Sequence, residues 1–128
     1  MARRALQTDA APKAIGPYVQ GVQVDGQRLT FLSGQIPLDP ATGELVGSDA
    51  AAQTDRVMRN LEAVLRAGGL GFENVVRCTI FLTDLADFGR VNEAYGKFFT
   101  GPPPARATVQ VSALPRGAKV EIDAIAVS

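Results

Sequence analysis

Hydrophobic and polar residues recur along this chain with two different periods. In residues 48–67 and 84–101 the apolar positions recur at helical spacing, which predicts two amphipathic helices. Five shorter segments alternate between apolar and polar positions and predict strands: residues 19–24, 28–33, 74–83, 106–112 and 119–127. The order β-β-α-β-α-β-β predicts one α+β domain over residues 1–128, with a mixed sheet and two helices on one face.

The ends of both helices carry sequence signals. Ser48 is placed to cap the free N–H groups of the first helix, and Gly68 is placed to end it. The second helix is predicted to begin near Asp84 or Asp87. It is predicted to end at Gly101, because the three prolines that follow cannot continue a helix.

Two connections bear on how the strands pair. Asp25-Gly26 is typical of a hairpin turn and predicts that the first two strands are antiparallel neighbours. The last two strands are also joined by a short segment, which suits a second hairpin. If Gln110 lies opposite Glu121 in that hairpin, then Arg106, Thr108 and Glu121 share one face of the sheet.

The strands carry more apolar residues than two helices readily cover. The surplus lies in the last two strands, at Val109, Val111, Ile122, Ala124 and Ala126. Because a large exposed apolar surface usually marks an interface, we expect a homo-oligomer that packs its sheets together.

The composition excludes several kinds of active site and argues against some classes of partner. The chain has no histidine and one cysteine, Cys78, which excludes histidine-based triads, imidazole metal sites and an internal disulfide. The 13 Lys and Arg balance the 13 Asp and Glu, which argues against nucleic acid as a partner. No apolar run is long enough to span a membrane, and residues 1–11, expected to be a frayed start, lack a secretory signal. We therefore expect a cytoplasmic protein.

Arg106 and Glu121 are the main candidates for chemistry. Arg106 opens a strand after a proline run and suits a carboxylate anchor, although a surface arginine or a structural ion pair has the same pattern. Glu121 suits an acid or base, or an outward-facing strand residue. Asn92, on the apolar stripe of the second helix, either caps a backbone carbonyl or faces a ligand. Cys78 lies on an apolar strand face and is predicted to be core.

Five short motifs occur in an order and at spacings that resemble the Rid (YjgF-like) family, and within it the RidA subfamily of 2-imino-acid deaminases. The resemblance extends over residues 11–127. The motifs are Gly16-Pro17-Tyr18-Val19-Gln20-Gly21, Ser33-Gly34-Gln35-Ile36-Pro37, Val91-Asn92-Glu93-Ala94-Tyr95, Pro104-Ala105-Arg106 and Val120-Glu121-Ile122-Asp123-Ala124-Ile125-Ala126.

The resemblance implies a fold like that of the trimeric chorismate mutases and a homotrimer with clefts between neighbouring subunits. It implies hydrolysis of 2-iminopropanoate and 2-iminobutanoate, or their enamine tautomers, to 2-keto acids and ammonia. It implies no cofactor and no metal. These imines leak from pyridoxal-phosphate enzymes, so the implied role is control of metabolite damage.

The resemblance also implies roles for individual residues. Arg106 would bind the substrate carboxylate, and Glu121 would place or activate the attacking water. The cleft would be lined by Tyr18, Ser33, Gly34, Asn92 and, through its backbone, Thr108. Many relatives carry a cysteine where this chain has Thr108, so a thiol mechanism is not expected here.

Two other functions fit parts of the same pattern. A non-catalytic trimer that binds a keto acid and regulates a partner would use the same Arg106 anchor. An endoribonuclease or translation inhibitor is the less expected alternative, because the chain has zero net charge and no basic stripe.

Overall fold

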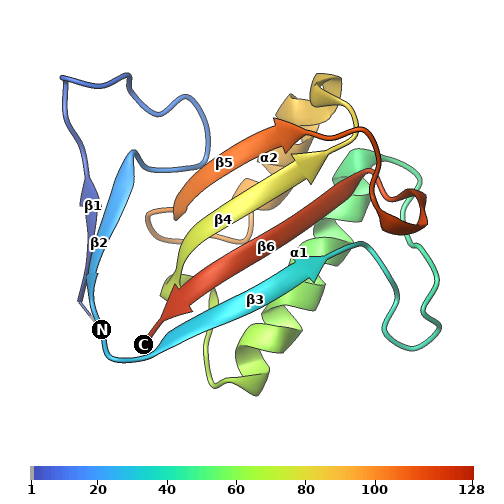
Figure 1. Ribbon diagram of the computed structural model, residues 1–128, viewed down its shortest axis with the longest axis horizontal. Helices are drawn as coiled ribbons and strands as arrows, with labels where there is room; N and C mark the ends of the chain where they lie inside the picture. The colour runs from blue at the N-terminus through green and yellow to red at the C-terminus, as the bar shows by residue number, and fades with distance from the viewer. Residues whose placement is uncertain (1) are drawn as a thin grey trace.

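The computed structural model describes residues 2–128 (Figure 1). Four strands form a sheet in the order β3-β6-β4-β5, in which only the β4–β5 pair is parallel. Both α-helices lie on one face of this sheet. The α+β class, the mixed sheet and the single helical face are thus confirmed. The elements are β1 (Ala2–Leu6), β2 (Gly21–Asp25), β3 (Leu29–Gln35), α1 (Ala50–Ala67), η1 (Phe72–Asn74), β4 (Val75–Leu82), η2 (Leu85–Asp87), α2 (Phe88–Gly96), β5 (Ala105–Gln110), η3 (Pro115–Gly117) and β6 (Val120–Val127).

The first helix begins one residue later than expected. Asp49, and not Ser48, is its N-cap, and the Asp49 side chain accepts a hydrogen bond from the Ala52 backbone N–H at 2.8 Å. The helix ends at Gly68, and Gly69 has the positive φ of 73° that favours glycine. The cap was misassigned because both residues are good N-caps and only the backbone geometry separates them.

At two positions of α1, burial does not follow the apolar or polar character of the residue. Val64 is 43% exposed, whereas Gln53 is buried. The Gln53 amide is accommodated because it accepts from the Lys119 N–H and donates to the Gly47 carbonyl. It therefore ties the start of the helix to the segment before β6.

The second helix is shorter than the sequence predicted. It ends at Gly96 and not at Gly101. The next backbone donors, of Phe98 and Phe99, bond to carbonyls three residues back, at Tyr95 and Gly96. These bonds tighten the last turn of the helix and give the Tyr95 and Gly96 carbonyls hydrogen-bond partners. The tighter turn directs both phenylalanines back toward the core.

The first hairpin is absent from the described residues, and the N-terminal segment is ordered. β2 pairs antiparallel with β1, and the two strands form a separate sheet beside the larger one (Figure 1). The N–H groups of Gln27 and Arg28 instead donate to the Ser128 carbonyl, which holds the connection to β3 open. Arg3 anchors β1 to the body of the molecule by donating to the carbonyls of Glu73 and Pro102. The frayed start was therefore a wrong expectation.

The second predicted hairpin is also wrong. β5 pairs in parallel with β4, and β6 lies between β3 and β4. Arg106 is aligned with Cys78 of β4, whereas Glu121 is aligned with Phe81, three residues further along. Because successive side chains of a strand point to opposite faces, Arg106 and Glu121 lie on opposite faces of the sheet.

The core lies between the sheet and the two helices. Ile122, Ala124 and Ala126 are buried there, so they do not belong to the uncovered surface as expected. The face away from the helices does carry exposed apolar residues: Val109 is 41% exposed, as expected, and Phe31, which was not predicted, is 71% exposed. Within residues 2–128, no helix is long and apolar enough to cross a membrane.

Replacement of Asp49 by alanine is expected to lower the free energy of unfolding by about 1 kcal/mol, because the Ala52 N–H loses its acceptor. Ser48→Ala is the matched control and should change the free energy of unfolding by about 0.5 kcal/mol or less. Urea unfolding of both variants measures the difference. Equal losses in the two variants would contradict the assignment of the cap.

Candidate active site

Arg106 is enclosed by aromatic rings at the start of β5. Its guanidinium carbon lies 5.2 Å from the ring centre of Tyr95, 5.4 Å from that of Tyr18 and 5.7 Å from that of Phe88. All three distances are within the range of cation–π attraction. The three rings form an aromatic cage that holds the guanidinium at one edge of the sheet.

Two separate parts of the chain build this cage. Phe88 and Tyr95 are seven residues apart on α2, so they lie on the same side of the helix. Tyr18 comes from the loop between β1 and β2, where its N–H bonds to the Gly16 carbonyl at 2.8 Å. The Tyr18 hydroxyl accepts from the Ile15 N–H at 3.2 Å, which fixes the ring above Arg106.

The charge of Arg106 has no carboxylate partner among residues 2–128. The two ion pairs found there join other residues, and the Nη1 atom of Arg106 is buried without a hydrogen-bond partner. Burial lowers the pKa of Arg106 below its usual value, but an arginine stays protonated at neutral pH. Arg106 is half-buried, and a partly desolvated cation with no counter-ion is unfavourable, so this site is suited to receive an anion.

Further unpartnered polar atoms belong to the residues around Arg106. The Oδ1 of Asn92 and the Oγ1 of Thr108 are buried with no hydrogen-bond partner within the described chain, whereas the Tyr95 hydroxyl lies beside the Cys78 thiol. A Cβ placed on Gly16 would lie 3.4 Å from the Asn92 Nδ2 and 3.6 Å from the Arg106 Nη2, so the Gly16 loop closes over both. Asn92 therefore lies near the Arg106 guanidinium, and its predicted role in facing a ligand stays a prediction.

A small cavity opens in front of the guanidinium. Its volume is about 160 Å³, and it is lined by Ile15, Tyr18, Phe88, Arg106 and Thr108. The cavity is lined by one cation, Arg106, two residues with hydroxyl groups, Tyr18 and Thr108, and apolar side chains. This lining suits a short carboxylic acid with a small apolar tail.

The other predicted site residues lie on the opposite face of the sheet. Glu121, half-buried on β6, is close to the exposed Gly34 at the irregular end of β3. A Cβ on Gly34 would overlap the Glu121 carboxylate, so the glycine is required for this arrangement. Ser33 is exposed beside them. The structure therefore places Tyr18, Asn92, Arg106 and Thr108 in one group, and Ser33, Gly34 and Glu121 in another.

Sequence reasoning missed Phe88 and Tyr95 as parts of the site. Both lie on the apolar stripe of the second helix, where an aromatic residue is expected to be core, and Tyr95 is indeed fully buried. The only sequence signal for an aromatic cage was the seven-residue spacing of these two rings, combined with Arg106, which has no obvious acidic partner. Cys78 is buried as predicted.

No group of three or more Cys, Asp or Glu side chains in residues 2–128 is arranged to hold a metal ion. The donors around Arg106 are cationic, aromatic or neutral, a set that does not fit a metal site. The chemistry that this arrangement supports is binding of a small anion.

Comparison with known proteins is consistent with this geometry. Residues 8–128 match the family described as Endoribonuclease L-PSP. The chain is 74% identical to Protein DfrA of Myxococcus xanthus, with all of this chain and 98% of that protein covered. It is 50% identical to the 2-iminobutanoate/2-iminopropanoate deaminase of Mus musculus, with 98% and 91% covered. The structure of RidA from a Psychrobacter species matches with a TM-score of 0.76 and 42% identity, over 98% of this chain and 99% of that one.

The thiol of Cys78 is expected to be unreactive in the folded protein. Burial raises its pKa to about 11, so at pH 8 only about one thiol in a thousand is the reactive thiolate. The rate of labelling by Ellman's reagent should be low in native protein at pH 8 and should rise as the pH approaches 10. Unfolding in guanidinium should expose the thiol and make labelling fast. Rapid stoichiometric labelling of the native protein at pH 8 would contradict the burial.

Proposed function

Because the chain belongs to the Endoribonuclease L-PSP family, also known as the YjgF/Rid family, we propose that it is a deaminase of small 2-imino acids. The proposed substrates are 2-iminopropanoate and 2-iminobutanoate, or their enamine tautomers, and the products are 2-keto acids and ammonia. The observation that supports this proposal most strongly is the caged guanidinium of Arg106, which has no carboxylate partner.

In the proposed complex, Arg106 binds the substrate carboxylate. A guanidinium matches a carboxylate with two parallel N–H···O bonds, and such bonds are strong when the site excludes water. The cavity of about 160 Å³ leaves room for a short aliphatic chain against Phe88 and Tyr18. Thr108 and Asn92 supply polar atoms near the carbon that reacts.

The proposed site is completed by a second copy of the chain, within a homotrimer. Glu121 lies on the opposite face of the sheet from Arg106, so one copy does not bring both residues to one substrate. Exposed Phe31 and Val109 lie on the same face as Glu121, and apolar surface of this kind favours contact with another copy. Arg106 lies on β5, at the edge of the sheet, where a neighbour can approach it. We therefore propose clefts between subunits, with Arg106 from one subunit and Glu121 from the next.

The proposed reaction begins with a protonated imine, which is already a good electrophile. Water adds to the imine carbon while Glu121 takes one of its protons, forming an amino alcohol. Glu121 returns this proton to the nitrogen, and the C–N bond breaks as the hydroxyl proton is released. The carbonyl forms and the released proton is taken up by ammonia, so iminium plus water gives keto acid plus ammonium.

The catalytic demands of this reaction fit a chain without histidine. Orientation of the substrate and one water contributes up to about 7–11 kcal/mol in the most favourable cases. A positioned carboxylate acting as a general base contributes about 10²–10⁴-fold. Neither contribution requires imidazole, a thiol or a cofactor.

A non-catalytic binding protein for keto acids is the second candidate. The caged Arg106 supports it equally, because anchoring a carboxylate is required for binding and for hydrolysis alike. The two functions differ at Glu121, which hydrolysis needs and simple binding does not.

Arg106→Ala should lower kcat/KM for 2-iminobutanoate, because the substrate carboxylate loses its charged anchor. The expected rise in activation free energy is about 2–5 kcal/mol. Glu121→Gln should lower kcat by about 10²–10⁴-fold while keto-acid binding persists. A coupled assay of imine lifetime measures both. Arg106→Ala with unchanged turnover would refute the deaminase, and Glu121→Gln with unchanged turnover would favour another base.

Mixing these two inactive variants tests the shared site. After unfolding and joint refolding at equal amounts, about a quarter of the clefts in a random trimer should combine an intact Arg106 with an intact Glu121 from the next copy. Activity should recover to about that fraction. No recovery in mixed trimers verified by mass would place both residues in one subunit's site.

Gly34→Ala should lower turnover and leave the binding of keto acids nearly unchanged. The added Cβ occupies the space of the Glu121 carboxylate, and the carboxylate must move, whereas the Arg106 cage on the other face is untouched. Gly101→Ala is the matched control, because a Cβ there meets nothing within 4 Å. Steady-state kinetics with titration calorimetry separates the two effects. An equal loss of activity in both variants would contradict this role of Gly34.

A further inference from the structure

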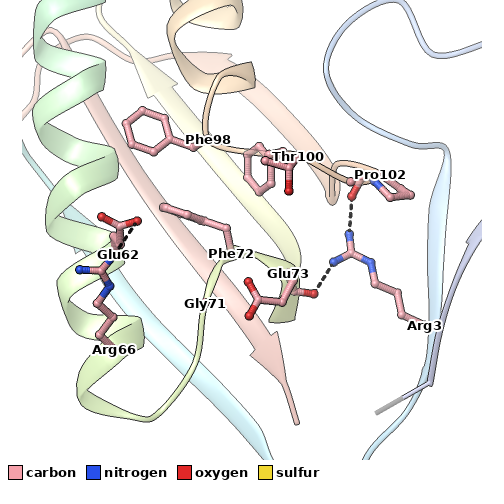
Figure 2. Close-up of a pocket in the computed structure, with 11 residues that line it drawn as sticks. Arg3, Glu62, Arg66, Gly71, Phe72, Glu73, Phe98, Thr100 and Pro102 are labelled. Carbon is pink, nitrogen blue, oxygen red and sulfur yellow. Dashed lines mark hydrogen bonds and ion pairs between the residues drawn. The ribbon is translucent and has the colours of Figure 1, made fainter.

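A second cavity, separate from the Arg106 site, lies where β1 meets the body of the molecule. Its volume is about 430 Å³, and it shares no lining residue with the Arg106 cavity. The walls come from β1, the end of α1, η1 and the segment after α2 (Figure 2). Segments far apart in the sequence therefore build it together.

One wall of this cavity is aromatic. The ring of Phe72 packs edge-to-face against Phe98, at 5.6 Å between ring centres, and against Phe99, at 5.5 Å. Phe98 and Phe99 are only half-buried, so part of their ring surface stays accessible. Such a wall offers a flat or branched apolar group a favourable contact.

A free carboxylate stands beside the aromatic wall. Glu73 has no ion-pair or side-chain hydrogen-bond partner within residues 2–128, and Figure 2 shows its carboxylate turned into the cavity. It reaches this position by folding back over Gly71, where a Cβ would overlap it. The carboxylate is thus available to a cation that enters the cavity.

Arg3 supplies the opposite charge on the same side. Its guanidinium donates to the carbonyls of Glu73 and Pro102, at 2.9 and 3.2 Å. An arginine has five N–H donors, so most of them remain available to an anion. Across the cavity, Arg66 and Glu62 are paired at 3.6 Å and largely neutralise each other.

These charges decide between classes of ligand. A simple anion would face the free Glu73 carboxylate, and a purely apolar ligand would use neither that carboxylate nor the remaining donors of Arg3. A ligand with one ammonium, one carboxylate and an apolar body satisfies all three features. An α-amino acid has this combination on adjacent atoms.

We propose that this cavity binds a zwitterionic α-amino acid with an aromatic side chain. Its ammonium group contacts Glu73, its carboxylate contacts the free donors of Arg3, and its ring packs on the wall of Phe72, Phe98 and Phe99. The site is distinct from the deaminase site and does not depend on the proposed reaction.

L-Phenylalanine is the probe, measured by titration calorimetry and by NMR of the intact protein. We expect saturable binding at concentrations below about 10 mM. Phenethylamine, which lacks the carboxylate, hydrocinnamate, which lacks the ammonium, and L-alanine, which lacks the ring, should each bind at least about tenfold more weakly.

Variants assign the binding to this cavity. Glu73→Gln should weaken binding of L-phenylalanine by about tenfold or more, because the ammonium loses a charged partner. Glu93→Gln, an exposed glutamate outside the cavity, is the matched control and should bind as the parent does. Arg106→Ala should also retain binding, which excludes occupation of the other site.

Three outcomes would overturn the proposal. They are no saturable binding of L-phenylalanine, equal binding of hydrocinnamate or phenethylamine, and unchanged binding by Glu73→Gln. Loss of binding in Arg106→Ala would assign the ligand to the Arg106 site instead. None of these results bears on imine hydrolysis, which is assayed separately.

Discussion

The caged guanidinium of Arg106 is the constraint around which this molecule is arranged. A half-buried cation without a carboxylate partner is unfavourable, and three aromatic rings offset only part of that cost. The rings come from both ends of the chain: Tyr18 from the loop after β1, and Phe88 and Tyr95 from α2. An ion pair at this position would neutralise the guanidinium and remove its capacity to bind an anion. The missing carboxylate is the feature on which the proposed anion site rests, because arrangements that are locally unfavourable for folding are expected at functional sites.

The strand order places the two residues that the proposed reaction needs, Arg106 and Glu121, on opposite faces of the sheet. β6 is placed between β3 and β4, and the alternation of side chains then directs Glu121 away from the helices and Arg106 toward them. With no histidine in the chain, Glu121 is the residue that the deaminase proposal uses as a base. A reaction that needs both groups therefore couples catalysis to assembly, since the exposed apolar face that carries Glu121 is also the surface that favours a second copy.

Periodicity and capping signals were sufficient to predict both helices and the five strands from β2 to β6, because those signals are local. The pairing of the strands was not predicted, because it depends on contacts distant in the sequence. A short connection before β6 suggested a hairpin with β5, yet α2 provides the crossover that makes β5 parallel to β4. For the candidate site, the motifs predicted Arg106, Tyr18 and Asn92, which lie together in the structure. Phe88 and Tyr95 were not predicted, because a buried ring on a helix has the same sequence pattern whether or not it contacts a cation.

The open connection between β2 and β3 determines which part of the sheet Tyr18 contacts. In a closed hairpin with Asp25-Gly26 as its two turn residues, Val24 would pair with Gln27, and six residues further along Tyr18 would lie opposite Ser33, beside Gly34. The carbonyl of Ser128 instead takes the N–H groups of Gln27 and Arg28, so β2 leaves the sheet and pairs with β1. The loop that precedes β2 then runs beside β5, where Val19 forms a bridge with Ala105 and Tyr18 covers Arg106. A backbone contact with the last residue of the chain thus overrides a strong local turn signal and delivers the third ring of the cage.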